Sequence, residues 1–310
     1  MANRVWVVGS LNADLVMPAV RLPAWGETIA GGQLQTLAGG KGANQACAAA
    51  RMGACTVMIG CVGEDDLGRF LNTELDRAGV DTSLVEAVPG ESTGSAIIFV
   101  RNEDGANAIA LSPGANARLT PAKVERHLRL AGPGDVLLCQ LETPPETVLA
   151  ALRMARRTGL LSLLDPAPAQ GVSNELLRAA GIVTPNESEA ASIVGRSDGD
   201  PSDTAQALRE AGAETVLLKL GAHGAFWMNR QEVHRVHAFR VDRVVDTTAA
   251  GDTFNGAFAA ARAGGAAVEE SLRIASAAAA ISVTRRGAQA SIPTADEVRA
   301  FLAAGPANIP

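Results

Sequence analysis

The chain has 310 residues, of which 47% are hydrophobic and 19% charged, and its formal net charge is −6. This composition is typical of a folded globular protein and excludes a disordered chain. Lys and Arg are scattered along an acidic sequence, which excludes nucleic acid and anionic membranes as expected partners.

The cysteines and the N-terminal segment predict a cytoplasmic location. None of the four cysteines has C-x-x-C spacing, and three lie in apolar surroundings, so we expect buried hydrophobic side chains rather than metal or redox sites. The first residues run into a strand-like segment, 5–8, without a signal-peptide pattern. No segment approaches the roughly 18 apolar residues that span a bilayer, so no membrane partner is expected.

The first third of the chain mixes short strands and turns with two helices. An apolar strand is predicted over 4–9, followed by a polar turn at 10–14 and by Gly/Pro-rich, non-helical segments over 18–40. Residues 92–111 predict a hairpin, because Asp104-Gly105 supplies the positive φ angles of a tight turn. Helical spacing of apolar residues predicts helices over 42–52 and 66–78.

From about residue 135 strands and helices alternate. The predicted strands are 136–139, 160–164, 182–184 and 215–219, and the predicted helices are 145–157, 174–180, 187–194, 203–211, 253–263, 268–283 and 295–303. Strands that are apolar throughout and alternate with helices predict a parallel sheet buried on both faces.

Polar residues and a glycine follow several of these strands. They are Asn12, Asp14, Glu142, Asp165, Asn186, Gly221 and Asp246. Ligands of such sheets bind beyond the carboxyl ends of the strands, so one cleft is expected to gather these residues.

The segment 246–256 carries the strongest chemical signal. Small residues, Ala249-Ala250-Gly251, precede Asp252 at the start of an Ala-rich helix, where backbone N–H groups and the helix dipole favour an anion such as a phosphoryl group in transfer. Asp252 is placed to take a proton from an attacking hydroxyl. An Asp that only caps the helix is an equally good interpretation of the same pattern.

A second glycine-rich segment, 39–44, precedes another helix. Gly42 follows Lys41, so the G-x-x-x-x-G-K-[ST] pattern of a P-loop is not met, and no G-x-G-x-x-G follows the first strand. Glycines beside Lys41 and Asn44 favour close approach to a polyhydroxy ligand, with a simple glycine-rich turn as the alternative.

These segments, together with Gly9-Ser10-Leu11-Asn12-Ala13-Asp14 and Thr184-Pro185-Asn186-Glu187-Ser188-Glu189, resemble the PfkB carbohydrate kinases. The resemblance extends over residues 7–293 and includes 90–94, 140–142 and 283–289. It implies a ribokinase-like α/β fold. This would be one three-layer α/β/α domain over residues 1–310 with a mostly parallel sheet, plus a small β-sheet lid built from about 12–40 and 92–111.

The resemblance also implies ATP-dependent phosphorylation of D-ribose at the 5-hydroxyl, giving D-ribose 5-phosphate and ADP. Asp252 would be the base, and the amides of Ala249, Ala250, Gly251 and Asp252 would stabilise the developing charge. The implied sugar contacts are Asn12, Asp14, Gly40, Lys41, Asn44, Glu142 and Asp252. An Asx turn is the alternative for Asp14.

The implied ATP contacts are Asn186, Lys219, Gly221, Ala222, Gly224, Gly251 and Ser276. Relatives often carry Thr where Lys219 stands. Glu189 would organise Mg²⁺ through water, and a helix-capping pair with Asn186 is the alternative. His223 is interpreted as a solvated turn residue. A K⁺ ion would be held by Asp246, Thr248, Ser282, Arg285, Gly287 and Ser291, mostly through backbone carbonyls.

Other acceptors of the family (deoxyribose, fructose or a nucleoside) and a non-catalytic sugar sensor are alternatives. The match at 90–94 and 284–289 favours ribose, and the sugar segments carry no added aromatic on which a nucleobase would stack. Intact Asp252, Gly251 and Asn186 argue against a sensor. The resemblance further implies a homodimer formed through the lid.

Overall fold

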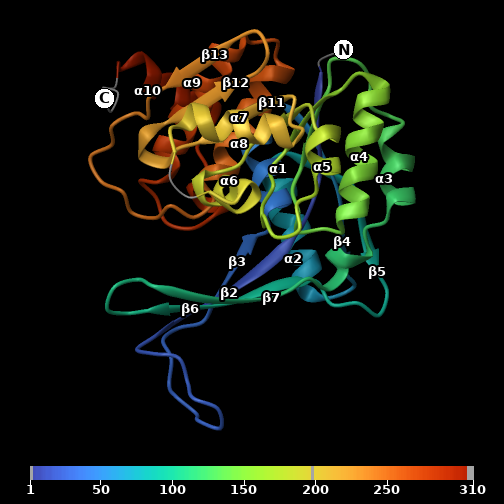
Figure 1. Cartoon of the computed structure of the whole chain (residues 1–310). Coiled ribbons are helices and arrows are strands. Elements are labelled where there is room, and N and C mark those ends of the chain that lie inside the picture. Colours follow the sequence, from blue (N-terminus) through green and yellow to red (C-terminus); the bar gives the residue numbers. More distant parts are fainter. Residues whose placement is uncertain (1–2, 197–198, 306–310) are drawn as a thin grey trace.

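A nine-stranded sheet forms the centre of the molecule in a computed structural model that describes residues 3–196 and 199–305 (Figure 1). In spatial order its strands are β13 (Val233–Val236), β12 (Ala225–Met228), β11 (Thr215–Lys219), β10 (Ile182–Val183), β9 (Leu161–Leu164), β8 (Val136–Cys139), β1 (Arg4–Val8), β4 (Cys55–Gly63) and β5 (Val80–Val88). Neighbours from β11 to β5 are parallel, and β12 and β13 add an antiparallel edge. The predicted, mostly parallel sheet is confirmed.

Both faces of this sheet are buried beneath helices. Along β1, Val5 and Val7 pack into one apolar core and Trp6 and Val8 into the other, because successive strand residues point to opposite faces. The first core is covered by α1 (Lys41–Arg51), α2 (Asp66–Arg77), α8 (Ala250–Ala263), α9 (Val268–Ser282) and α10 (Ala295–Ala303). The second is covered by α3 (Pro121–Leu128), α4 (Pro145–Thr158), α5 (Asn174–Ala179), α6 (Glu187–Val194) and α7 (Pro201–Ala211). The three-layer α/β/α prediction is therefore confirmed.

A second, four-stranded sheet projects below the main body in Figure 1. Its order is β3 (Gln35–Gly39), β2 (Asn12–Ala19), β6 (Gly94–Arg101) and β7 (Asn107–Ser112). β2 pairs antiparallel with β3 and parallel with β6, and β6 and β7 form the predicted hairpin with Gly105 at φ 75°. Most of the segments predicted for a lid thus form one small sheet beside the main one, while residues 20–34 form a connection without strands.

Several details differ from the sequence predictions. The predicted turn at 10–14 is wrong beyond residue 11, because β2 begins at Asn12 and places Asp14 on a strand rather than in an Asx turn. Helix α7 begins at Pro201, directly after its N-cap Asp200, and not at residue 203 as predicted. Helix α8 begins at Ala250 and not at residue 253. Strands β4, β5, β12 and β13, helix α3 and the short 3₁₀ helices Gly114–Arg118, Gly221–His223 and Gln289–Ser291 were not predicted.

The cysteines behave as expected for apolar side chains. Cys47, Cys61 and Cys139 are buried, Cys55 is exposed, and all four are free. Burial raises the pKa of the Cys47 thiol to about 11, which keeps it protonated. Among the described residues, no helix is both long and apolar enough to cross a bilayer.

Candidate functional site

A cavity of about 490 Å³ lies where the sheet's strands end and α8 begins. Its lining comprises Lys41, Asp165, Asn186, Glu187, Ser188, Glu189, Lys219, Gly221, Thr247, Ala249, Ala250, Gly251 and Asp252. Asp165 follows β9, Asn186 follows β10 and Lys219 ends β11, so these residues reach the cavity from the carboxyl ends of neighbouring parallel strands. The expected gathering of polar residues in one cleft is confirmed for this part of the set.

Close packing of α1 against α8 positions the centre of the site. A Cβ on Gly256 would lie 2.5 Å from both the Cβ of Ala48 and the carbonyl oxygen of Gln45, so only glycine lets the two helices approach so closely. This contact brings Asn44 and Gln45 of α1 against Asp252 of α8, although more than 200 residues separate them in the chain.

Asp252 is almost fully buried, and its carboxylate is held by side chains of α1. Asn44 Nδ2 donates to its Oδ2 and Gln45 Nε2 to its Oδ1, each at 3.0 Å. The N-cap of α8 is Ala249, and no side chain of the described residues caps this helix, so the interpretation of Asp252 as a cap is wrong. Burial raises the pKa of Asp252, and the nearby Lys41 ammonium opposes this shift.

The sugar-side residues converge from β2, α1 and the end of β8. Asn12 and Asp14 lie two residues apart on β2 and therefore on the same face. One oxygen of Glu142, Oε2, accepts from Ser10 Oγ (2.6 Å), the Lys41 amide (3.0 Å) and Asn12 Nδ2 (3.4 Å). In the described part of the chain no group donates to its other oxygen, Oε1, so the carboxylate keeps capacity to bind a hydroxyl.

Asn12 is in turn held by Asn116, a residue that no sequence motif singles out. Asn116 Nδ2 donates to Asn12 Oδ1 (2.7 Å) and to the carbonyl of Leu11 (3.1 Å), and the Leu11 amide donates to Asn116 Oδ1 (2.9 Å). Asn116 lies in a short 3₁₀ helix without exposed surface. Its only sequence signal is an Asn in a turn-like segment, and Asn is common in turns that have no part in a binding site.

The entry to α1 explains the glycines beside Lys41. Gly40 is the N-cap with φ 88°, and a Cβ there would lie 2.7 Å from the Asn12 amide nitrogen. The left-handed angle and the lack of space both require glycine.

Burial disfavours the Lys41 ammonium, but the carboxylates of Asp252, Asp165 and Glu142 outweigh it and raise its pKa, so Lys41 stays charged.

Asp14 has an unusual ionisation. Burial, and then repulsion from Glu142, raises its pKa to about 6. A partly buried carboxyl that titrates this close to neutral pH, beside the carboxylate of Glu142, indicates a functional site rather than a structural surface residue.

The first turn of α8 directs backbone amides toward the cavity. Ala249 has φ 58°, a left-handed angle that an L-residue adopts at a cost of about 1 kcal/mol, and so turns the backbone into the helix. The Ala250 amide donates to the Thr247 carbonyl (3.2 Å), and the Thr253 amide donates to the Ala249 carbonyl (2.8 Å). Within the described residues, the amides of Gly251 and Asp252 have no acceptor, as expected for a helix N-terminus open to an anion.

Asn186 and Glu189 form a capping box at the start of α6. Asn186 Oδ1 accepts from the Glu189 amide and Glu189 Oε2 accepts from the Asn186 amide, both at 2.8 Å. The capping alternative is therefore confirmed. Both residues also line the cavity, and burial raises the pKa of Glu189.

A second, apolar cavity of about 280 Å³ adjoins the first. Lys219, Gly221, Thr247, Ala250 and Gly251 line both cavities. The apolar part is formed by Ala238, Phe239, Val241, Val244, Phe254, Ala279, Ala280 and Val283, and Ala222, Gly224 and Ser276 complete the wall. The Ser276 hydroxyl is buried and has no hydrogen-bond partner among the described residues. A flat apolar group with one polar edge fits this cavity, and a charged tail would extend toward Lys219.

Lys219 pairs with Asp165 at the junction of the two cavities. The Nζ–Oδ1 distance is 3.0 Å, and the two side chains are only 11% and 4% exposed. In the sequence Asp165 is one of several polar residues that follow strands, and no local pattern indicates its ion pair.

The loops expected to hold a monovalent cation meet at Asp246. Its Oδ1 accepts from the amide and hydroxyl of Thr248 (2.9 and 2.6 Å), and its Oδ2 accepts from the Gly287 amide (2.9 Å). Burial disfavours the Asp246 carboxylate, but these hydrogen bonds outweigh it and lower its pKa, so the group is an anion at neutral pH. Ser282 and Ser291 turn their hydroxyls to nearby carbonyls, and the Arg285 guanidinium pairs with Glu297. Any cation contact from these three residues would thus come from the backbone.

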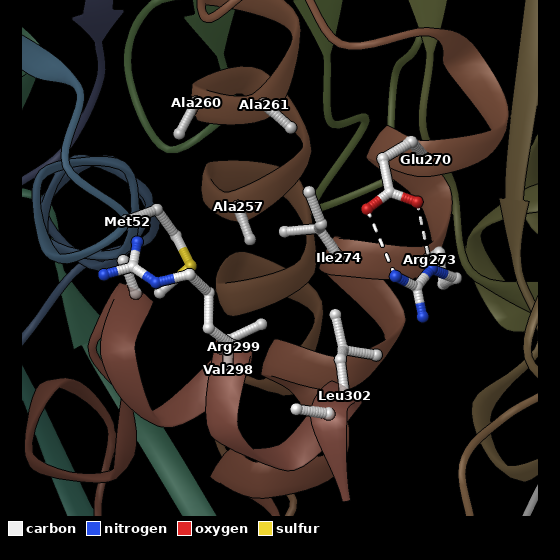
Figure 2. A pocket seen from close by; sticks show the side chains of 12 residues that line it. Met52, Ala257, Ala260, Ala261, Glu270, Arg273, Ile274, Val298, Arg299 and Leu302 are labelled. Atoms are coloured by element: carbon white, nitrogen blue, oxygen red, sulfur yellow. Dashed lines mark hydrogen bonds and ion pairs between the residues drawn. The ribbon is translucent and has the colours of Figure 1, made fainter. Parts of the chain in front are cut away.

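A separate hollow of about 590 Å³ lies between α8, α9 and α10 (Figure 2). Met52, Ala257, Ile274, Val298 and Leu302 give it apolar walls, and the acidic side chain in its lining, Glu270, is paired with Arg273 at 2.9 Å. None of the predicted site residues lines it, and among the described residues around it there is no unpaired carboxylate to act as a base.

Comparison with known proteins agrees with this arrangement. The model of the pfkB family carbohydrate kinases matches residues 2–295. The chain belongs to the pfkB family. This pfkB-family chain is 41% identical over 305 residues to the ribokinase of Haemophilus influenzae, covering 97% of this chain and 99% of the relative. It is 36% identical over 305 residues to the deoxyribokinase of Salmonella typhi, covering 96% and 97%.

A solved structure of Arabidopsis thaliana ribokinase complexed with ribose and ATP superposes on the pfkB-family chain with a TM-score of 0.89. The two are 36% identical, and the match covers 97% of this chain and 99% of the other. The ribokinase-like fold predicted for this pfkB-family chain is therefore confirmed.

Proposed function

We propose that this chain transfers the γ-phosphoryl group of ATP to the 5-hydroxyl of D-ribose, giving D-ribose 5-phosphate and ADP, with Asp252 as the base. The observation that carries the proposal is the buried Asp252 carboxylate, which lies beside the open amides of α8 and between the sugar-side and phosphate-side residues. The relatives, which include a ribokinase structure with ribose and ATP, support the choice of substrates.

In this proposal the sugar lies between the small sheet and α1. The carboxylates of Asp14 and Glu142 accept hydrogen bonds from its secondary hydroxyls, while Asn12 and Asn44 hold neighbouring oxygens and Lys41 and Gly40 complete the pocket. Among the described residues, Glu142 Oε1 and Asn44 Oδ1 have no partner, which supports this role. The 5-hydroxyl then points to Asp252.

Asp252 removes the proton as the hydroxyl attacks the γ-phosphorus in line. Its raised pKa brings the carboxylate closer to the operating pH, which suits a general base. The small sheet, acting as a lid, excludes water that would otherwise compete with the sugar as acceptor.

The nucleotide occupies the two adjoining cavities. The adenine lies in the apolar cavity with Ser276 at its edge, against the Gly221, Ala222 and Gly224 turn, and the phosphates extend past Lys219 and Asn186 toward α8. The amides of Ala249, Gly251 and Asp252 and the helix dipole stabilise the charge on the transferred group. The expected contribution of the Ala250 amide is dropped, because this amide already donates to the Thr247 carbonyl.

The chemistry of the side chains also fits two cations. Mg²⁺, which relies on phosphate oxygens and retained waters, would be organised by Glu189 through water and would neutralise charge on the phosphates. K⁺ would be held by the anionic Asp246 with carbonyls of Thr248, Ser282, Arg285, Gly287 and Ser291, beside the first turn of α8. The Asp246 carboxylate joins the loop that contains Thr248 to the loop that contains Gly287 by accepting hydrogen bonds from the amides of both residues.

We further propose one catalytic domain, with the lid as a dimer interface and the cytoplasm as its location. The lid exposes Ile97, Ile109 and Leu111 to 48%, 58% and 50%, and burial of such side chains in a symmetric dimer would cover the small sheet. Four free cysteines and the use of ATP suit the cytoplasm.

A sugar panel tests the proposal. ADP release is measured with ribose, 2-deoxyribose, fructose and a nucleoside, each with and without K⁺, and ³¹P NMR locates the new phosphate ester. Ribose is expected to give the highest kcat/KM and a 5-phosphate. Absence of turnover with every sugar despite binding would favour a sensor and refute the enzyme proposal.

The second candidate acceptor is 2-deoxyribose. The observation that favours it is the similarity to the Salmonella typhi deoxyribokinase over nearly the whole chain. A kcat/KM for 2-deoxyribose above that for ribose in the same panel would replace ribose as the substrate.

A further inference from the structure

The Gln45 side chain joins the two buried carboxylates of the site. Its Nε2 donates to Asp165 Oδ2 at 2.9 Å and to Asp252 Oδ1 at 3.0 Å. Gln45 has no exposed surface, and both amide hydrogens are used by these two acceptors. It belongs to the lining of neither the polar nor the apolar cavity, so it acts on the site only through these carboxylates.

The two carboxylates fix the orientation of the Gln45 amide, and a second glutamine supports it. Gln140 Nε2 donates to Gln45 Oε1 at 2.7 Å. If the Gln45 amide were flipped, its oxygen would face two carboxylates and its nitrogen would face the Gln140 donor, so both contacts would be repulsive. The network therefore has one favourable arrangement, in which Gln45 donates to Asp252.

The same amide links Asp252 to the phosphate side of the site. Asp165 accepts from Gln45 through Oδ2 and from Lys219 Nζ through Oδ1, at 2.9 and 3.0 Å. Lys219 lies above the first turn of α8, because a Cβ on Gly251 would be 3.4 Å from its Nζ. An unbroken series of hydrogen bonds thus runs from the lysine, through Asp165 and Gln45, to the proposed base.

We propose that Gln45 is a positioning residue for Asp252, and that through Asp165 it couples the orientation of the base to Lys219. The proposal rests on the proposed function, in which Asp252 is the base. Asn44 holds one oxygen of Asp252 and Gln45 the other, so two consecutive residues of α1 fix the plane of the carboxylate. One lone pair on each oxygen remains for the sugar hydroxyl.

The alternative is that Gln45 is only structural and satisfies buried polar groups. The pKa of Asp252 distinguishes this alternative from a positioning role. The charged groups that face Asp252 are Lys41 from α1 and Asp165 beyond β9. The hydrogen bond from Gln45 favours the carboxylate and lowers the pKa of Asp252, whereas the charge of Asp165 raises it. Loss of the amide and loss of the Asp165 charge must therefore shift the pKa in opposite directions.

Gln45→Met keeps the side-chain length and removes both donors, and Asp165→Asn removes the charge. Misplacement of a catalytic group by about 1 Å costs up to about 10²-fold in rate, so we expect Gln45→Met to lower kcat by about 10- to 100-fold. The KM for ribose is expected to change by less than about threefold, because Gln45 touches no proposed sugar contact other than Asp252.

The pKa of Asp252 is read in two ways. The acid limb of the kcat profile, measured with saturating ribose, reports it in the substrate complex, whereas the kcat/KM profile would also contain the ionisation of Asp14. ¹³Cγ-aspartate NMR of the whole protein reports it without turnover, the Asp252 signal being the one lost in Asp252→Asn. Gln45→Met is expected to raise this pKa and Asp165→Asn to lower it. Thr147→Val is the control, because Thr147 is equally buried, lines neither cavity and loses one hydrogen bond, to the Leu119 carbonyl.

If Gln45→Met does not fold, Gln140→Met removes only the bond that Gln45 Oε1 accepts, and a smaller shift in the same direction is expected. Shifts of the same sign in the Gln45 and Asp165 variants, or a kcat within threefold of the Thr147→Val control, would overturn the proposal. Absence of turnover in the wild-type protein would instead refute the proposed function, and the NMR titration would still decide the role of Gln45.

Discussion

The ionisation of Asp14 makes ribose binding depend on pH. Its pKa, raised to about 6 by burial and by Glu142, means that the carboxylate dominates at pH 7.5 and that only about one-tenth of it remains at pH 5. If only the ionised form accepts the sugar hydroxyls, the apparent Kd rises by a factor of 1 + 10^(pKa − pH). We therefore expect an increase of about 11-fold at pH 5 and of about 1.1-fold at pH 7.

Isothermal titration calorimetry of D-ribose between pH 5 and 8 measures this dependence without turnover. Asp14→Asn is expected to weaken binding about tenfold at pH 7.5, because a hydrogen bond to a charged group is lost, and to flatten the profile below pH 7. In Asp252→Asn the affinity for ribose is still expected to fall at low pH, because Asp14 is intact. A wild-type Kd that changes less than threefold between pH 7.5 and 5 would refute the reasoning.

The same raised pKa predicts a stability cost. A carboxyl whose pKa is higher in the folded state is protonated more readily there, so it lowers the stability as pH rises from about 3.8 through 6 and stays unfavourable above. Asp14 is half-buried, so Asp14→Asn is expected to raise the free energy of unfolding at pH 8 by about 1–3 kcal/mol, and by little near pH 4. Urea unfolding at the two pH values measures the difference, and an equal gain at both would point to another cause.

Three further substitutions test the site. Asp252→Asn is expected to lower kcat by about 10²- to 10⁴-fold with ribose affinity within about threefold of the wild type, and near-normal turnover would remove Asp252 as the base. Gly256→Ala is expected to cost about 1–3 kcal/mol of stability by forcing α1 and α8 apart, and to lower kcat. Gly264→Ala, at the C-cap of the same helix with φ −74°, is the control that should be tolerated in unfolding and rate assays. Lys219→Met leaves the Asp165 carboxylate buried without its counter-charge and is expected to destabilise the protein by about 3 kcal/mol. Adding Asp165→Asn should recover more than half of that loss of stability. If the double variant's change in unfolding free energy, measured in urea, equals the sum of the two single changes, Lys219 and Asp165 are not coupled.

Local patterns were sufficient for most elements of the fold. Apolar runs such as 136–139 and 215–219 predicted buried parallel strands, and Asp104-Gly105 predicted the hairpin of β6 and β7. Strand β5 was missed because it lacks a continuous apolar run and buries only Val80 fully, with the polar residues Asp81, Ser83 and Glu86 among its members. The same polarity hid the edge strand β13.

Asn186 and Glu189 both cap helix α6 and line the cavity, and together these two roles show a limit of sequence patterns. Four residues at the start of a helix predict a capping box, and the capping box is present. The same two side chains also line the cavity beside Lys219, which their spacing alone does not indicate. A pattern within one turn of helix fixes local hydrogen bonds, whereas proximity to a ligand depends on the strands that carry the helix.

By itself, the sequence determined a layered α/β protein of the pfkB family, and it identified Asp252, Asp14 and Asn44 as candidates for its chemistry. Only the tertiary structure decided that Asp252 is no cap, that its partners are Asn44 and Gln45, and that Asp165 and Lys219 lie at the end of the same network. The physical reason is sequence separation. Residue patterns reflect backbone geometry over a few positions, whereas these contacts join residues that are 54 to 208 positions apart. They exist because parallel strands end at one edge of the sheet and because Gly256 lets α1 and α8 meet.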